Sequence, residues 1–435
     1  MIEASGTGIR ACVVFLSALL ATGAALAQQD TLHLTLAEAE KIALQSNPAL
    51  SAAEFTAGAA AQVPNEVRAG LEPNFFGSFT GVGADSGSRL AAGGLNNPVV
   101  YNRIGSGLSL SQLITDFGRT SNLISEAKFS AAAQDQVTQT VHAGILLDTD
   151  RAYFAVLRAH SLLTVALQTV SARQLVADQV AQLAASKLKS QLDVSFANVN
   201  LADAKLQLLD AQNGLQASEA QLATAMGIPG QVGFVLAEEP TPDAPPDRIN
   251  PLIDHAIRQR PELANLRFQS TAAERFFQAE KALAYPSVGV IATAGFVPAG
   301  QAAIPGRYGA FGANVTVPIF NGGLFKARRT EAELRAQAAT KRIQDQENRI
   351  VRDVRIAYLN ALNAYDRMSL TAQLLDQAKL GQDLAQSRYD LGLGSIIELS
   401  QAQLNFTSAQ IANAGAKYDY QTQHSLLQYE IGDLR

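Results

Sequence analysis

The spacing of hydrophobic residues switches between two periods along the chain. Residues 36–69 carry apolar side chains every three to four positions, as one face of an amphipathic helix does. Residues 73–83 and 104–113 instead alternate apolar with small or polar side chains, and a polar loop over 85–102 separates these two runs. This order predicts one helix followed by two β-strands.

The second half of the chain repeats the same order. Helical spacing over 249–284 is followed by alternating runs at 286–296 and 308–317. Strands that alternate small or polar residues with apolar ones are typical of a barrel wall with a wet interior, and an ordinary soluble hairpin is the alternative.

Two very long helices are predicted from stretches that lack proline, about 118–187 and about 324–391. At 1.5 Å per residue each would be roughly 100 Å long, which far exceeds a globular domain. Return helices are predicted at about 192–226 and about 395–431. A return helix and the opening helix of the other half, laid end to end, span about one long helix, which predicts a single cylinder wall.

The two halves are related by an internal repeat. A shift of 205 places Gly118 on Gly323 and Tyr153 on Tyr358, and the register continues without a gap to position 227. Chance similarity between alanine-rich helices is the alternative, and the gapless register argues against it.

The earlier parts of the two halves pair at a shift of 213, which places Asn47-Pro48 on Arg260-Pro261. We therefore divide the chain into a first repeat, 28–237, a proline-rich linker, 238–248, and a second repeat, 249–435. The linker is not expected to be helical because proline interrupts helices.

The first 27 residues predict a secretory signal peptide. Arg10 precedes the apolar run 11–20, and Ala25-Leu26-Ala27 is a cleavage pattern. A transmembrane anchor is the alternative, but the run is shorter than the roughly 18 to 20 residues that a span needs. Cys12, the only cysteine, lies in this segment, so the mature chain is expected to have no disulfide and no lipid anchor. We expect no later stretch to be apolar enough for a helical span, which leaves a β-barrel as the way into a membrane.

Composition limits the function classes. Only 17% of the residues are charged against 47% hydrophobic, which suits helices packed on several sides by other helices. The net charge is -5, so the chain has no excess of basic residues, and a nucleic-acid partner is not expected. The five histidines are scattered, and phosphate-binding and nucleophile motifs are missing. We therefore expect neither an enzyme nor a cofactor nor a metal site.

Five segments in order resemble the TolC family of outer-membrane efflux proteins. The segments are Leu36–Leu50, its repeat Ala256–Leu263, the strand exits Leu113–Gly118 and Val317–Gly323, and the turn Arg388–Gln403. The resemblance covers nearly the whole mature chain. No single segment is diagnostic, but the ordered and doubled set is specific.

The resemblance implies a fold that is mainly α with a small β-barrel portion. Three protomers would each give four strands to a shared twelve-stranded transmembrane β-barrel in the outer membrane, and their helices to a long periplasmic α-barrel. Elementary physics agrees on one point, because four strands cannot close a barrel and open edges cannot face lipid.

The function that the resemblance implies is a passive exit duct of a tripartite efflux pump or a type I secretion system. Its partners would be outer-membrane lipid, a periplasmic adaptor and, indirectly, an inner-membrane transporter that supplies the energy. A soluble periplasmic coiled-coil scaffold or adaptor is the alternative, although it does not explain the doubled strand pairs. A general porin is disfavoured because four strands are too few. The sequence does not reveal the cargo.

The resemblance also implies a periplasmic gate at the tips of the helix hairpins. Glu398 and its repeat partner Asp193 match acidic positions that ring the constriction, and Tyr389 matches a gate tyrosine. A carboxylate repeated by threefold symmetry would favour cations. The alternative is that both acids are N-terminal helix charges favoured by the helix dipole.

The gate positions depart from the family pattern. Gly394 stands where the best-studied member of the family has an arginine, and Gln401 replaces a second acid. We therefore expect Lys187 or Lys189 to supply the missing cation.

The same tips are expected to meet the periplasmic adaptor. The alternative is that these residues only form the turns between the helices. The predicted docking residues are Leu188, Ser190, Leu391, Gly392, Leu393, Gly394 and Ser395.

Overall fold

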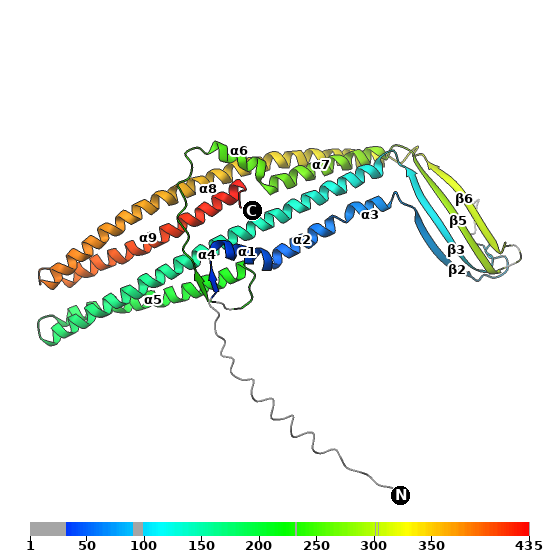
Figure 1. Cartoon of the computed structure of the whole chain (residues 1–435). Coiled ribbons are helices and arrows are strands. Elements are labelled where there is room, and N and C mark those ends of the chain that lie inside the picture. Colours follow the sequence, from blue (N-terminus) through cyan, green and yellow to red (C-terminus); the bar gives the residue numbers. More distant parts are fainter. Residues whose placement is uncertain (1–31, 90–98, 231–232, 301, 303, 435) are drawn as a thin grey trace, which may run out of the picture.

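The protein is elongated, with a four-stranded sheet at one end and helix hairpins at the other (Figure 1). The computed structural model describes residues 32–89, 99–230, 233–300, 302 and 304–434. The predicted signal peptide, 1–27, lies outside the described residues, as does part of the predicted loop 85–102.

The helices run roughly along the long axis, and α4 and α8 dominate the fold with 67 residues each. Their ends lie within two residues of the predicted ranges. The helices of the first half are α1 (Leu36–Ser46), α2 (Pro48–Ala60), α3 (Val63–Ala69), α4 (Arg119–Ala185) and α5 (Gln191–Ala225). Those of the second half are α6 (Asn250–Gln259), α7 (Pro261–Ala282), α8 (Leu324–Asp390) and α9 (Ile396–Ile431).

Prolines divide the opening segment of each half, where the sequence predicted one continuous helix over 36–69 and another over 249–284. Asn47 and Arg260 each precede a proline and have ψ angles of 118° and 124°, which are extended rather than helical. The proline ring pushes the preceding residue out of the helical region, so one helix ends there and the next begins. The prediction of two unbroken helices was therefore wrong.

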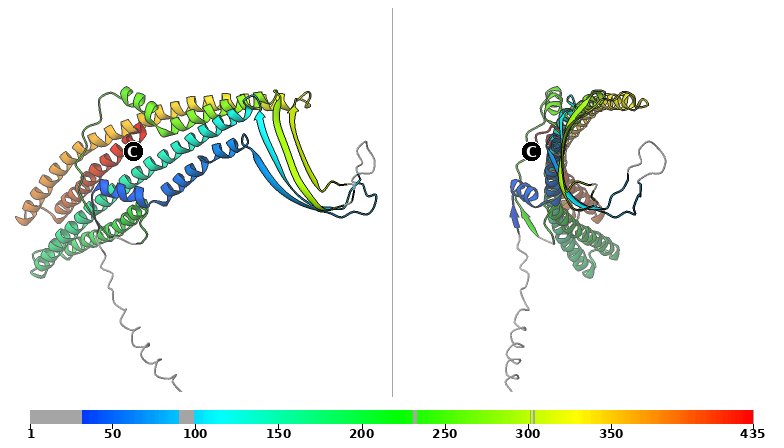
Figure 2. Two further views of the ribbon diagram at one scale, coloured as in Figure 1. Left: turned by 45° about the vertical axis from the view of Figure 1, so that its right-hand side comes forward. Right: turned by 90° about the vertical axis from the view of Figure 1, so that its right-hand side faces the viewer.

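The four strands form one antiparallel sheet in the order β2-β3-β5-β6, so the hairpins of the two halves join through β3 and β5. The sheet curves strongly, as Figure 2 shows. The strands are β2 (Asn74–Val82), β3 (Arg103–Thr115), β5 (Ser287–Gly300) and β6 (Arg307–Thr316). The largest departure from the predicted ranges is β5, which ends at residue 300 instead of 296.

The sheet has one apolar and one polar face, because residues opposite each other in the register share a face. The apolar face carries Phe75, Phe79, Leu108, Leu110, Phe296 and Phe311, with Ser106, Gln112 and Arg307 as polar exceptions. The polar face carries Ser78, Thr80, Gly107, Ser109, Thr293, Gly295, Tyr308 and Asn314, with Phe76, Val82 and Ile291 as apolar exceptions.

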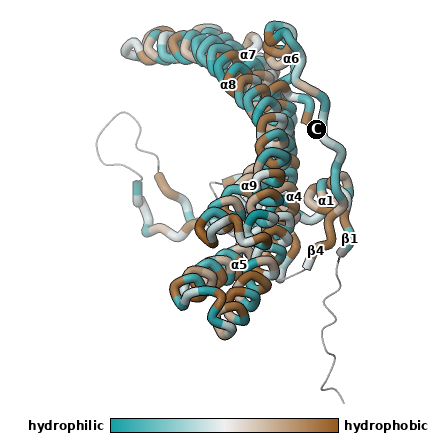
Figure 3. The backbone as a smooth tube through the Cα atoms, turned by 90° about the vertical axis from the view of Figure 1, so that its left-hand side faces the viewer, coloured by the Kyte–Doolittle hydropathy of each residue, from teal (hydrophilic) through white to brown (hydrophobic). Residues whose placement is uncertain are grey.

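A parallel pair of short strands, which the sequence did not predict, lies beside the middle of the helices. β1 (Leu32–Leu34) pairs with β4 (Phe234–Leu236). Three residues are too few to show a period-two pattern, so pairing of these segments appears only in the tertiary structure. Viewed from the hairpin tips, the long helices form an arc, and β1, β4, α1 and α6 lie outside it (Figure 3).

Two repeat-related tyrosines anchor the ends of the proline-rich linker. The hydroxyl of Tyr153 donates to the carbonyl of Ala237 at 2.7 Å, and that of Tyr358 donates to the carbonyl of Pro246 at 3.0 Å. Between these points, Tyr418 donates to a carboxylate oxygen of Glu238 at 2.6 Å. The linker is thus fixed against α4, α8 and α9 although it has no helical structure.

Helix α4 contains a stretch of 18 residues with a mean hydropathy of 1.2, long and apolar enough by length and composition to cross a membrane. The expectation that no such stretch would follow the signal peptide is wrong by this measure. α4 packs against helices of both halves, so its sequence is apolar on several sides, and 28% of the stretch is buried in one chain.

Asp150 is a buried carboxyl group where α1, α4 and α9 meet. It is 2% exposed, and its Oδ1 atom has no hydrogen-bond partner among the described residues. Burial, followed by the nearby carboxylate of Glu40, raises the pKa of Asp150 to about 8, and a hydrogen bond from Ser425 opposes the shift. The folded chain therefore favours the protonated form of Asp150 more than the unfolded chain does.

The stability of the protein is expected to fall as the pH rises through this titration. The folded chain retains a proton on Asp150 that the unfolded chain releases above about pH 4, so the free energy of unfolding decreases between about pH 4 and pH 8. Asp150→Asn mimics the neutral acid, and its melting temperature should depend less on pH and exceed that of the unmodified protein at pH 8 by a few degrees. Thermal denaturation in detergent at pH 5 and pH 8 measures this.

Asp148→Asn is the matched control, because Asp148 lies on the same helix with its side chain 71% exposed. It should leave the pH dependence unchanged. Equal pH dependence in the Asp150→Asn and Asp148→Asn variants would contradict the assignment.

Candidate functional site: the hairpin tips

Two helix hairpins reach the end of the molecule that lies away from the sheet (Figure 1). The first tip joins α4 to α5, and the second joins α8 to α9. Each long helix ends in the same hydrogen-bonded turn, in which Leu188 N–H donates to the Leu183 carbonyl at 2.9 Å and Leu393 N–H to the Arg388 carbonyl at 2.8 Å. This six-residue closure is the Schellman motif of helix C-termini.

The two tips differ at the residue that adopts the left-handed conformation. Gly392 has a φ of 74°, as this motif favours, and the repeat-related Lys187 has a φ of 60°. A non-glycine residue in this region costs on the order of 1 kcal/mol. The first tip therefore stores strain that the second avoids.

Serines cap the return helices at both tips. The hydroxyl oxygens of Ser190 and Ser395 accept the N–H groups of Asp193 and Glu398, at 3.2 and 3.1 Å. The carboxylate of Asp193 in turn accepts the backbone N–H of Ser190 at 3.0 Å, which completes a capping box. These hydrogen bonds lower the pKa of Asp193, the backbone bond having the larger effect.

Glu398 has a different partner, although it occupies the same repeat position. Its Oε1 atom accepts the Nε–H of Arg388 at 3.0 Å, and the same guanidinium donates to the carbonyl of Leu393 at 3.2 Å. Sequence reasoning missed Arg388 because its repeat partner is Leu183. The available signal was its place in the last turn of α8, where a basic residue favours the helix dipole.

Tyr389 lies between the two hairpins. It is 6% exposed and packs in a cluster with Val180 of α4, Leu201 of α5 and Leu399 of α9. Its hydroxyl is buried without a hydrogen-bond partner in the described part of the chain. Burial, and then the charge of Asp193, raises the pKa of this phenol.

Lys189 of the first tip reaches the second tip. Its Nζ atom lies 4.5 Å from the ring centroid of Tyr389, within range for a cation–π interaction. The structure thus brings Lys189 to Tyr389 and Arg388 to Glu398. Lys187, the other predicted cation, is the strained turn residue.

The predicted docking residues make an exposed apolar surface on the tips. Leu188 is 71% exposed, Leu391 75% and Leu393 69%. Gly394 N–H donates to the Arg388 carbonyl at 3.0 Å, so Gly394 belongs to the turn. Leucines are exposed along α5 and α8 as well, for example Leu206 and Leu380.

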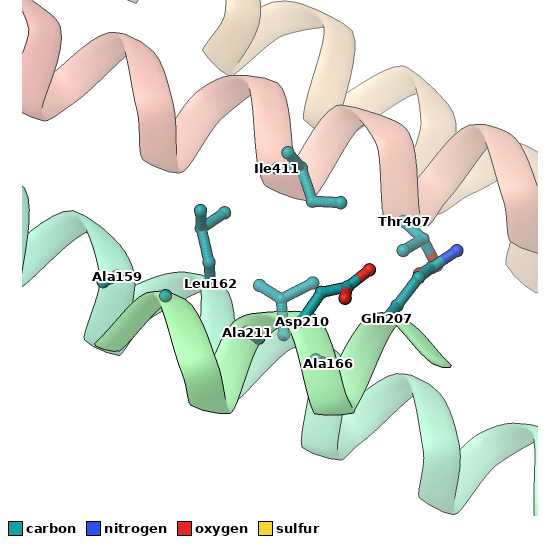
Figure 4. Close-up of a pocket in the computed structure, with 10 residues that line it drawn as sticks. Ala159, Leu162, Ala166, Gln207, Asp210, Ala211, Thr407 and Ile411 are labelled. Atoms are coloured by element: carbon teal, nitrogen blue, oxygen red, sulfur yellow. The ribbon is translucent and has the colours of Figure 1, made fainter. Parts of the chain in front are cut away.

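A cavity that the sequence did not predict lies further along the hairpins, between α4, α5 and α9 (Figure 4). It has a volume of about 310 Å³ and a mainly apolar lining, with Gln207, Asp210 and Thr407 as its polar residues. Gly214 and Ala211 of α5 and Ala159 and Ala166 of α4 contribute little side chain to it.

The tips carry balanced charge and no metal-binding group. Lys187, Lys189 and Arg388 stand against Asp193, Asp390 and Glu398. Among the residues that the structure describes, no cluster of three or more histidine, cysteine or acidic side chains could hold a metal ion.

Comparisons with known proteins agree with this architecture. The chain is 25% identical over 424 residues to outer membrane protein TolC of Salmonella enteritidis, a match that covers 92% of this chain and 83% of TolC. It is 23% identical to the alkaline protease secretion protein AprF of Pseudomonas aeruginosa, over 94% of this chain and 86% of AprF. A crystal structure of CusC superposes with a TM-score of 0.79 at 18% identity and covers 91% of this chain and 92% of that one.

The family described as outer membrane efflux protein matches residues 40–228 and 252–432, and so includes both halves and all four strands of the sheet. Its members are channel proteins, which fits the expectation that the chain is not an enzyme. Because the match covers most of the sequence, the chain belongs to the outer membrane efflux protein family.

Proposed function

We propose that three copies of the chain form a passive exit duct through the outer membrane, which an adaptor connects to an inner-membrane transporter. Family membership assigns the chain to the outer membrane as an efflux channel with a large periplasmic part. The trimer, the barrel, the gate and the docking surface are the parts that we add. Nothing in the relatives supports the alternative of a soluble scaffold or adaptor.

The two-faced sheet is the observation that carries the proposal. Its apolar face exposes phenylalanines at 75, 79 and 311, which water would not favour and lipid would. Its outer strands β2 and β6, with 9 and 10 residues, each have one edge without a strand partner among the residues that the structure describes. Pairing β2 of one copy with β6 of the next would satisfy both edges, and twelve strands from three copies would close the wall.

The long helices also support lateral assembly. Leu192, Val199 and Leu206 of α5 are exposed and recur every seven residues. Leu370 and Leu374 of α8 are likewise exposed and four residues apart. Such seams are typical of helices that pack against a neighbour, here another copy in the wall of the duct.

We further propose that the hairpin tips close the periplasmic end. Tyr389 and Lys189 join the two hairpins of one protomer, while Asp193 and Glu398 supply the acidic positions. Since Arg388 neutralises Glu398 and Lys189 lies near Asp193, the closed ring has little net charge. The gate therefore depends on contacts between hairpins more than on a free acidic ring.

The adaptor is proposed to dock on the exposed leucines of the tips. The glycines and serines at 392, 394, 190 and 395 shape the two turns, so that Leu188, Leu391 and Leu393 face outward. A partner that presents an apolar surface at its own tip would bury them.

Ion selectivity tests the gate. Arg388→Gln frees the carboxylate of Glu398, so we expect the preference for cations over anions to increase several-fold, because a threefold ring of unpaired carboxylates favours cations. The reversal potential of single channels in planar bilayers under a salt gradient measures this. The double variant Arg388→Gln/Glu398→Gln is the control and should return to the original selectivity, whereas equal selectivity in all three proteins would remove Glu398 from the gate.

Disulfide trapping tests the trimer. The mature chain is expected to lack cysteine, so Ser78→Cys on β2 can be combined with cysteine at position 310, 312 or 314 on β6, all on the polar face. At least one pair should form covalent trimers under mild oxidation, because β2 and β6 of neighbouring copies would be adjacent. Non-reducing gel electrophoresis reports this, with Ser78→Cys alone as the control. Monomers in every combination would argue against this strand pairing.

Co-purification tests the docking surface. Leu393→Ser should reduce recovery of the adaptor by about tenfold without loss of the trimer, since burial of one leucine contributes roughly 1.5 kcal/mol or more. Leu380→Ser is the matched control, because Leu380 is similarly exposed on α8 but lies away from the tip. Equal adaptor recovery with both variants would refute docking at the tips.

A further inference from the structure

One row of residues crosses all four strands on the polar face of the sheet. The register pairs Ser78 with Gly107, Gly107 with Gly295, and Gly295 with Tyr308. Neighbouring strands are about 4.8 Å apart, so these residues lie side by side across the sheet. The two central positions have no side chain, and the outermost one has the large ring of Tyr308.

Tyr308 occupies the space that the two glycines leave. A Cβ atom at Gly295 would lie 2.3 Å from Cζ of Tyr308, and a Cβ atom at Gly107 would lie 2.2 Å from its hydroxyl oxygen. Neither position could hold even an alanine while the ring stays where it is. The phenol therefore lies flat across Gly295 with its hydroxyl over Gly107, whereas strand side chains usually stand roughly perpendicular to the sheet.

Open space remains above the flat ring. A cavity of about 360 Å³ on this face is lined by Tyr308 together with Ser78, Thr80 and Arg103. Tyr308 itself stays 43% exposed. An upright tyrosine would project into this space and occupy it.

We propose that the flat position of Tyr308 over Gly107 and Gly295 determines the width of the pore in the segment that the strands form. This inference rests on the proposed function, in which the polar face lines the lumen. Three such rings would lie against the wall at one level of the barrel, one from each copy. The glycine pair thus keeps the exit wide for bulky cargo, because it gives each ring a place outside the conducting path.

Gly295→Ala tests the proposal, since the added methyl group displaces the ring toward the lumen. We expect single-channel conductance to fall roughly twofold as the pore narrows. The second readout is the size of the largest neutral polymer that enters from the strand side. This size should decrease, and it does not depend on the hairpin tips at the other end.

Two further variants make the test specific. Gly295→Ala/Tyr308→Ala should restore both readouts, because the methyl group no longer meets a ring. Gly312→Ala is the matched control on the polar face of β6, where a Cβ atom has no neighbour within 4 Å, and it should change neither readout.

Each outcome decides the matter. An unchanged polymer limit in Gly295→Ala, or a reduced limit that the double variant does not restore, would overturn the role of Tyr308. If the unmodified protein forms no channel, the proposed function itself fails, and the role of Tyr308 fails with it.

Discussion

A helix about 100 Å long cannot bury any of its own surface, so α4 and α8 need neighbours along their whole length. The chain meets this need with shorter helices laid end to end. α5 and α9 pack along the tip half of α4, while α2, α3 and α7 pack along the half nearer the sheet, and α8 is covered in the same way by α9 and by α6 and α7. The proline breaks, the linker and the short β1–β4 pair all lie where these shorter helices meet. The middle of the molecule therefore joins the two halves, and the buried carboxyl group of Asp150 lies there.

The two halves show how a repeat can keep a backbone and change its chemistry. Tyr153 and Tyr358 occupy matching positions and bind opposite ends of one linker. Asp193 and Glu398 also match, but one closes a capping box and the other pairs with Arg388. Because the helices keep their register, each hairpin tip can diverge without disturbing the packing above it. Helices that share one packing pattern and tips that differ in their contacts suit a duct whose end meets a particular partner.

The balance of charge at the tips changes how closure would work. Exposed ion pairs such as that of Arg388 with Glu398 contribute little to stability, whereas the buried ring of Tyr389 joins residues of three helices. Its hydroxyl has no partner among the described residues, which is costly for a buried polar group. Separation of the hairpins would expose that hydroxyl to water and recover part of the cost. In the proposed gate, apolar packing would therefore hold the hairpins together, and the unpartnered hydroxyl would favour their separation.

The sequence by itself determined the long helices and the four strands, because these depend on local periodicity and on where proline and glycine interrupt it. It also identified Asp193, Tyr389 and Glu398 as candidates, although only through a family resemblance. The tertiary structure decided which partners these side chains have. Arg388 reaches Glu398 across a turn, and Lys189 reaches Tyr389 of the other hairpin, and no local sequence pattern predicts either contact. The tertiary structure likewise placed Tyr308 over Gly107 and Gly295, which are 188 residues apart in the sequence (295 − 107). Contacts of this kind depend on strand register and helix packing, and these are settled only when the whole chain folds.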